Sequence, residues 1–273
     1  MTMLTEIPNI IIFGESGSGK SSVVNMLVGR PVAKTSSGVR GCTFDSCAYD
    51  VDVLGQPMKL WDTAGLDEGE TGRIPHSKSV VNLYKLVLDL GSNGVSLLMF
   101  VTRPRFKDST LKNWKLFHEI ICQKKVPSVI IITGLELEED RDEWWWKNRS
   151  ELAEDYGITP DDHACITAVR GKSLRNGTHM FDEEFETSKE RVQWVMRSRF
   201  SDPWRVSPPQ WCQTIFKSTS ETRWCGLRPP KTVVTEEEVI GEAFQQLIET
   251  GMSEEDVEEL VEKFREAEQT RTD

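Results

Sequence analysis

Short apolar stretches alternate with amphipathic stretches along the first 200 residues. A short apolar run bounded by polar or glycine-rich residues is typical of a buried strand, and apolar residues repeated every three or four positions are typical of a helix. The sequence predicts strands at 7–13, 44–54, 57–61, 95–101, 126–133 and 164–167. It predicts helices at 20–28, 77–90, 110–122, 144–156 and 181–200. This alternation favours an α/β fold with a mostly parallel sheet and helices on both faces.

The pattern changes after residue 200. Five of the twelve prolines lie between 201 and 234, which predicts an extended connector because proline continues neither a helix nor a ladder. From 235 to 273 two apolar stripes, each preceded by a helix-capping signal, predict a helical hairpin. We therefore expect a main domain over 1–200, a connector over 201–234 and an acidic helical tail over 235–273.

The net charge of −11 is concentrated near the C-terminal end, where residues 231–273 hold fourteen acidic and four basic residues. The rest of the chain is almost neutral and has no basic stripe, so we expect no nucleic-acid partner. The six cysteines show no metal-binding spacing, and neither a secretory signal, a membrane-length apolar run nor a lipidation motif is visible. We expect a cytoplasmic protein with reduced thiols and no membrane anchor.

The strongest chemical signal follows the first predicted strand. The segment matches the phosphate-loop pattern G-x-x-x-x-G-K-[ST] with Gly14-Glu15-Ser16-Gly17-Ser18-Gly19-Lys20-Ser21. Glycines let backbone amides turn toward oxyanions, and the N-terminus of the following helix adds positive potential. Lys20 is expected to reach the β- and γ-phosphates and Ser21 to bind Mg²⁺, with nucleotide contacts extending to Ser22.

A second motif, Trp61-Asp62-Thr63-Ala64-Gly65, places Asp62 42 residues after Lys20. Asp62 is expected to hold Mg²⁺, directly or through water, and the Gly65 amide to sense a γ-phosphate. In this order the two motifs resemble the first and third motifs of the translation-factor-related class of P-loop GTPases. The resemblance covers about residues 7–200 and implies a G domain whose six-stranded, mostly parallel sheet has one antiparallel edge strand.

The resemblance places Thr43 between the two motifs, as the threonine that closes on Mg²⁺ and the γ-phosphate. Together with a cysteine four residues later, this setting resembles the immunity-associated and chloroplast-import GTPases, which are grouped with the septins. The chain is also similar to small G-domain proteins found in fungi. The resemblance implies Lys20, Thr43 and Gly65 as catalytic residues and Ser21, Thr43 and Asp62 as magnesium ligands.

The base-reading motifs depart from the family's pattern. Thr133-Gly134-Leu135-Glu136 stands where [NT]-K-x-D is usual: Thr133 fits, Gly134 replaces the lysine that lies along the base, and Glu136 replaces the aspartate that accepts from guanine. Thr167-Ala168-Val169 takes the place of the last motif, whose backbone amide contacts the base. The resemblance implies GTP and GDP as ligands, with adenine use as the alternative.

The residue after the second motif is Leu66, where signalling GTPases carry the glutamine that orients the attacking water. We expect slow, Mg²⁺-dependent GTP hydrolysis, on the order of 10⁻⁴–10⁻³ s⁻¹, in a nucleotide-controlled switch with an effector protein. In the resembling subgroup a second protomer across the nucleotide completes the site, so a homodimer is expected. The alternatives are a non-hydrolysing, nucleotide-bound scaffold and an adenine-using P-loop NTPase.

Overall fold

The computed structural model describes residues 7–33, 47–63, 86–87, 90, 93–122 and 124–204. The chain divides after Arg205 into two units, and all of these residues belong to the first. The predictions for Thr43, Gly65 and Leu66, and those for most of the connector and for the tail, fall outside the described residues. None of the helices within the described ranges is long and apolar enough to cross a membrane.

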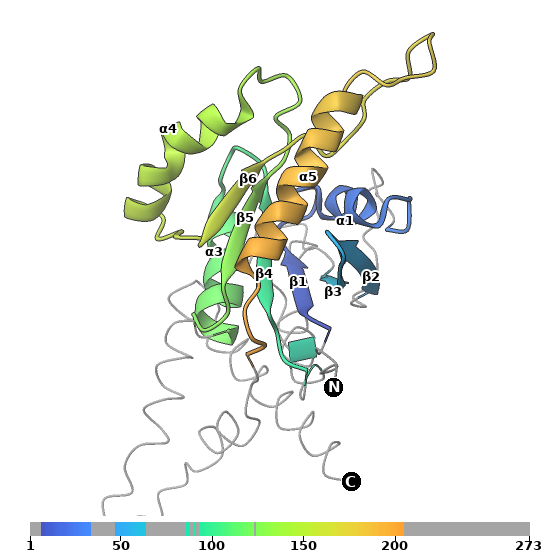
Figure 1. Ribbon diagram of the computed structural model, residues 1–273. Helices are drawn as coiled ribbons and strands as arrows, with labels where there is room; N and C mark the ends of the chain where they lie inside the picture. The colour runs from blue at the N-terminus through green and yellow to red at the C-terminus, as the bar shows by residue number, and fades with distance from the viewer. Residues whose placement is uncertain are drawn as a thin grey trace, which may run out of the picture. The chain divides into compact units, whose positions relative to one another are not determined.

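Six strands form one sheet in the order β2-β3-β1-β4-β5-β6 (Figure 1). The strands are β1 (Asn9–Phe13), β2 (Cys47–Val53), β3 (Gln56–Asp62), β4 (Leu97–Thr102), β5 (Ser128–Ile132) and β6 (Asp162–Cys165). Strand β2 pairs antiparallel with β3, and every other pairing is parallel. This confirms the predicted mostly parallel, six-stranded sheet with one antiparallel edge strand.

The described helices follow the strands as the sequence predicts. They are α1 (Lys20–Val28), α3 (Asp108–Trp114), α4 (Arg141–Glu154) and α5 (Asp182–Arg199). The predicted helix at 110–122 is α-helical only as far as Trp114 and continues with π-helical spacing as η1 (Lys115–Ile121). Of the predicted helix at 77–90, only positions 86, 87 and 90 are described.

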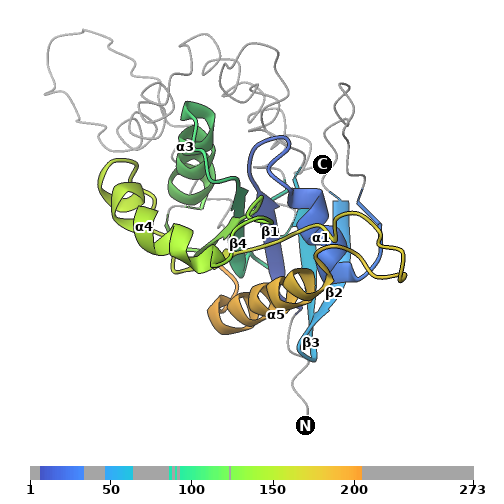
Figure 2. The same cartoon turned by 90° about the horizontal axis from the view of Figure 1, so that it is seen from above.

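The central strand β1 is buried on both faces, because successive side chains of a strand point in opposite directions. Ile10 and Ile12 pack into a core with Val23 of α1 and Val192 of α5. On the other face, the ring of Phe13 stacks against those of Phe100 and Phe117. Viewed from above, α1 and α5 lie on one side of the sheet and α3 on the other (Figure 2).

The start of the predicted connector contacts the sheet domain. Trp204 and Val95 exchange two backbone hydrogen bonds of 2.8 Å each. The chain that leaves α5 therefore returns to the amino end of β4.

The parallel strands β1, β3, β4, β5 and β6 all end at the same edge of the sheet, where α/β proteins bind their ligands. The phosphate loop follows β1, and Asp62 is the last residue of β3. Thr133 follows β5, and Thr167 comes shortly after β6. The topology thus gathers the described members of the predicted site at one edge.

Candidate nucleotide-binding site

The phosphate loop has a backbone conformation that requires glycine at three positions. Gly14, Gly17 and Gly19 have φ values of 142°, 74° and 102°, which side chains of L residues rarely allow. A β-carbon at Gly14 would also lie 2.0 Å from the carbonyl oxygen of Val101. The loop is therefore pressed against the end of β4 as well as turned back on itself.

Helix α1 begins at this loop without a cap. Its N-cap residue, Gly19, has no side chain that could accept a hydrogen bond from the first amides of the helix. The first turn holds no acidic residue. By contrast, α4 is capped by Asp140, whose carboxylate accepts from the amide of Asp142. An uncapped N-terminus presents amide donors and partial positive charge, which suit a phosphate oxygen.

The side chain of Lys20 folds back into the loop. Its ammonium group is buried and donates to the carbonyl oxygens of Gly14 and Glu15, at 2.8 Å each. A positive charge is thus held within the ring of backbone that the motif predicts to surround phosphates. The role of Lys20 as a phosphate ligand stays a prediction, and this placement of its charge suits it.

The loop is anchored on its outer side by contacts that the sequence motif does not reveal. Thr110, in α3, donates its hydroxyl to the carboxylate of Glu15, and Lys107 Nζ lies 3.9 Å from Glu15 Oε2. Glu15 therefore does more than fill a variable position of the phosphate loop. Neither Thr110 nor Lys107 carries a sequence signal for this role, because the contact depends on how α3 packs.

Asp62 has the features of a cation ligand. Its Oδ1 atom is buried and has no hydrogen-bond partner among the described residues. Burial raises the pKa of Asp62 from 3.8 to about 6, although the charge of Lys20 lowers it. An orphaned, buried carboxylate oxygen is costly unless a cation reaches it.

Magnesium fits this environment better than a metal that needs a protein cage. The described residues contain no group of three His, Cys, Asp or Glu side chains able to hold an ion. Mg²⁺ is usually held by one or two carboxylates together with phosphate oxygens and water. Asp62 and the half-buried Ser21 in the first turn of α1 are the described candidates.

Thr133 lies against the phosphate loop. Its hydroxyl donates to the carbonyl oxygen of Ser18 at 2.5 Å, and a β-carbon at Gly19 would lie 3.1 Å from its side chain. The first residue of the predicted base-reading motif thus braces the loop that the first motif forms. The same motif continues with the buried Leu135 and the half-buried Glu136.

The last predicted motif lies beside this one, because β6 pairs with β5. The amide of Ile166 donates to the carbonyl oxygen of Ile132 at 2.8 Å. The amide of Thr167 is already engaged by Ser188 Oγ at 2.9 Å, and Ala168 is buried. Val169 is 43% exposed.

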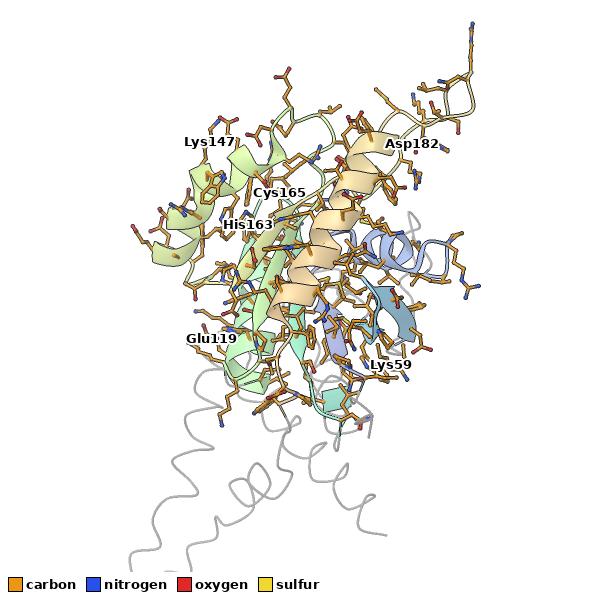
Figure 3. The ribbon with its side chains drawn as sticks, in the orientation of Figure 1. Lys59, Glu119, Lys147, His163, Cys165 and Asp182 are labelled. Atoms are coloured by element: carbon orange, nitrogen blue, oxygen red, sulfur yellow. The ribbon has the colours of Figure 1, made fainter. Side chains whose placement is uncertain are left out.

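Helix α4 is fixed to the sheet behind these two motifs. The ring of Trp145 stacks on that of His163 in β6, with centroids 4.3 Å apart. Figure 3 labels His163 and Cys165 on this strand. Burial lowers the pKa of His163 and raises that of the Cys165 thiol to about 12. Both shifts favour the uncharged form of the side chain.

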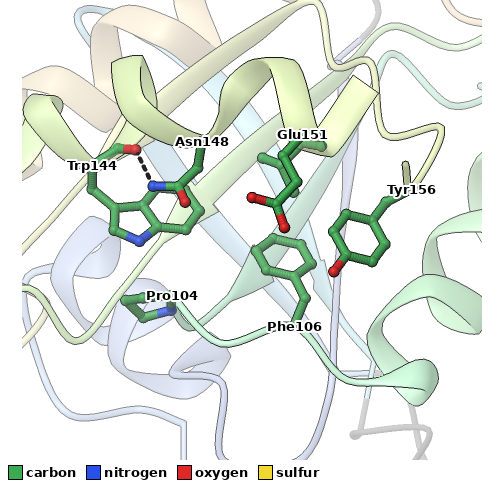
Figure 4. Close-up of a pocket in the computed structure, with 7 residues that line it drawn as sticks. Pro104, Phe106, Trp144, Asn148, Glu151 and Tyr156 are labelled. Atoms are coloured by element: carbon green, nitrogen blue, oxygen red, sulfur yellow. Dashed lines mark hydrogen bonds between the residues drawn. The ribbon is translucent and has the colours of Figure 1, made fainter. Parts of the chain in front are cut away.

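A small cavity of about 90 Å³ opens between α4 and the segment that follows β4 (Figure 4). It is lined by Pro104, Phe106, Trp144, Asn148, Glu151, Leu152 and Tyr156. The rings of Phe106 and Trp144 are nearly parallel, with centroids 6.2 Å apart. Small-molecule sites usually measure about 300–1,000 Å³, so this cavity is too small for a nucleotide.

Comparison with known proteins agrees with the fold and motifs. Residues 9–133 match a family described as 50S ribosome-binding GTPases. The tRNA modification GTPase MnmE of Leptospira biflexa is 28% identical over 165 residues, which are 58% of this chain and 31% of that protein. The structure of Era from Aquifex aeolicus with GDP and AlF₄⁻ has 13% identity and a TM-score of 0.51, covering 75% of this chain and 60% of that one.

The sheet order and the phosphate loop give an α/β fold of the P-loop G-domain type, and the match to the GTPase family covers residues 9–133, a little under half of the chain. The likeness to Era supports the fold alone. The chain spans less than a third of the length of its MnmE relative. What the relatives do as whole proteins is therefore considered below only as a proposal.

Proposed function

We propose that this chain binds GTP and GDP with Mg²⁺, hydrolyses GTP slowly and acts as a nucleotide-controlled switch. The observation that carries the proposal is the phosphate loop: Lys20 is buried inside it, and α1 opens from it without a cap. Asp62 supports it, because its buried carboxylate oxygen lacks a partner among the described residues. These features stabilise a bound polyphosphate and its cation more than the empty site.

Each residue has a role in this proposal. Lys20 and the amides that follow Gly14 hold the β- and γ-phosphates, and Ser22 extends the contacts along α1. Ser21, Asp62 and Thr43 hold Mg²⁺, which when bound neutralises phosphate charge. Gly65 senses the γ-phosphate, and the segments around Thr43 and Gly65 order when it is present.

Guanine selection rests on Glu136 and the neighbouring Thr167–Val169 segment. A carboxylate accepts from the two N–H groups on one edge of guanine, and adenine offers no such pair. Thr133 is assigned to the phosphate loop, since its hydroxyl is engaged by Ser18. Membership of the subgroup that includes the septins and the immunity-associated and chloroplast-import GTPases, with a second protomer across the nucleotide, remains part of this proposal.

Calorimetric titration of the nucleotide-free protein with GDP, a non-hydrolysable GTP analogue and ADP, each with Mg²⁺, tests binding. We expect tight guanine-nucleotide binding and weak ADP binding. Lys20→Ala should abolish guanine-nucleotide binding, while Lys147→Ala, at an exposed position of α4, should leave it unchanged. Unchanged affinity in Lys20→Ala would refute the phosphate-loop assignment, and equal affinity for GDP and ADP would point to the adenine-using alternative.

Turnover measured across a range of protein concentrations tests the switch. We expect about 10⁻⁴–10⁻³ s⁻¹ when the protein is dilute and faster turnover when it is concentrated, if a second protomer completes the site. GTP left intact after overnight incubation at high concentration would favour the scaffold alternative. A dilute turnover above about 1 s⁻¹ would contradict slow hydrolysis.

A role in tRNA modification is a second candidate, because relatives with that name share the G domain. The matched part is only 31% of the Leptospira protein. Outside its acidic tail this chain is nearly neutral and shows no basic stripe. We therefore expect no tRNA binding in a gel-shift titration at physiological salt, and a salt-dependent shift would favour this candidate.

A further inference from the structure

The base-reading motif lacks its cationic side chain. The resemblance calls for a lysine along the base at position 134, and the chain has glycine there. Gly134 has a φ of 81°, in the left-handed region that L side chains rarely adopt. A lysine at this position would be strained, so another part of the chain would have to supply the positive charge.

Arg103 occupies the space beside Gly134. It follows β4, which pairs with β5, the strand that leads into the motif. A β-carbon at position 134 would lie 3.8 Å from Arg103 Nη1 and 4.0 Å from its Cγ. Both the aliphatic part and the guanidinium of Arg103 therefore lie in van der Waals contact with the position that the β-carbon of a lysine at 134 would occupy.

Arg103 is also fixed to the phosphate loop. Its Nε atom donates to the carbonyl oxygen of Gly17 at 3.0 Å. This bond holds the guanidinium between the phosphate loop and the base-reading motif while the side chain as a whole stays exposed. A planar guanidinium held in one place is suited to lie against an aromatic face, because it is weakly hydrated and stacks well.

We infer that Arg103 covers one face of the bound guanine base, in place of the lysine that is missing at position 134. The inference rests on the proposed function. It makes Arg103 a nucleotide-contacting residue outside both base-reading motifs. It also links base and phosphate recognition, because one side chain contacts the base and, through Gly17, the phosphate loop.

The test compares Arg103→Ala and Arg103→Lys with wild type, with Arg105→Ala as the matched control. Arg105 is a second exposed arginine in the same segment. Affinities for GDP and for inorganic pyrophosphate, both with Mg²⁺, are measured by displacement of a fluorescent guanine nucleotide. We expect Arg103→Ala to weaken GDP binding about tenfold and to leave pyrophosphate binding within about twofold.

Arg103→Lys should recover part of the GDP affinity, since lysine keeps the charge but loses the planar surface. Arg105→Ala should match wild type, and all variants should unfold at nearly the wild-type temperature. Equal losses for GDP and pyrophosphate would overturn the inference, because Arg103 would then act only through the phosphate loop. Unchanged GDP binding would overturn it too, whereas wild-type protein that fails to prefer GDP over ADP would count against the proposed function itself.

Discussion

Replacement of Asp62 by asparagine should stabilise the nucleotide-free protein at neutral pH. Burial raises the pKa of this carboxyl from 3.8 to about 6, so the folded chain opposes its ionisation. Asparagine has nearly the same shape and no charge. The variant removes the free-energy cost of ionising a buried carboxyl. It also removes a magnesium ligand that the proposed function needs.

The magnitude follows from linkage between protonation and folding. A pKa raised from 3.8 to about 6 corresponds to about 3 kcal/mol at pH values well above 6. Between about pH 4 and 6 the folded state binds this proton and the unfolded state does not, so the contribution of Asp62 to stability rises as the pH falls. Because a buried amide also lacks partners, we expect Asp62→Asn to gain about 1–3 kcal/mol at pH 7.5 and little at pH 4.

Urea unfolding of nucleotide-free protein in a chelator, at pH 7.5 and at pH 4–5, measures this directly. Asp50→Asn is the matched control, because its carboxylate is 87% exposed on β2 and should change stability little. The difference between variant and wild type cancels the contributions of His118 and His163, whose lowered pKa values act in the opposite direction as the pH falls.

The same variant should lose the Mg²⁺ dependence of nucleotide binding. Wild type should also lose it on acidification, because a group of pKa about 6 is mostly ionised at pH 7.5 and mostly protonated at pH 5. A variant less stable than wild type at pH 7.5 that still binds Mg²⁺ with nucleotide would refute the reasoning. It would mean that the Asp62 carboxylate is satisfied within the protein.

Three further substitutions probe the phosphate loop. Gly14→Ala should cost at least about 2 kcal/mol in urea unfolding, because its β-carbon would lie 2.0 Å from the carbonyl oxygen of Val101. Gly55→Ala should cost less, because Gly55 also has a positive φ, of 79°, but its β-carbon would meet open space. Thr133→Val should weaken pyrophosphate binding several-fold by losing the bond to Ser18, and Thr133→Ser should restore it, as displacement titration can show. Thr110→Val should lower the affinity for GDP in calorimetry by loosening Glu15, and an unchanged affinity would show that this anchor is structural only.

The elements of the fold could be predicted because each strand and helix carries its own pattern. The isoleucines of β1 are buried whichever face they take, and α1 begins at the lysine of a motif defined by local spacing. The roles of Thr133 and Arg103 could not be predicted in this way. They arise because parallel strands end at a common edge, which brings residues 115 and 86 positions from the phosphate loop into contact with it.

The features that define the site are also those that destabilise the empty domain. Gly14 and Gly19 lose much conformational entropy when they are fixed at a positive φ. Helix α1 lacks a cap, and the buried Oδ1 atom of Asp62 has no partner among the described residues. Each costs about 0.5–3 kcal/mol in other proteins, and they are concentrated at one edge of an otherwise well-packed sheet. A bound polyphosphate with its cation would satisfy both the free amides of α1 and the Asp62 carboxylate, and a ligand that binds only the folded state stabilises it by mass action. Under the proposed function, loss of the γ-phosphate would return part of that cost locally, and the residues around the phosphate loop would supply the free-energy difference that a switch requires.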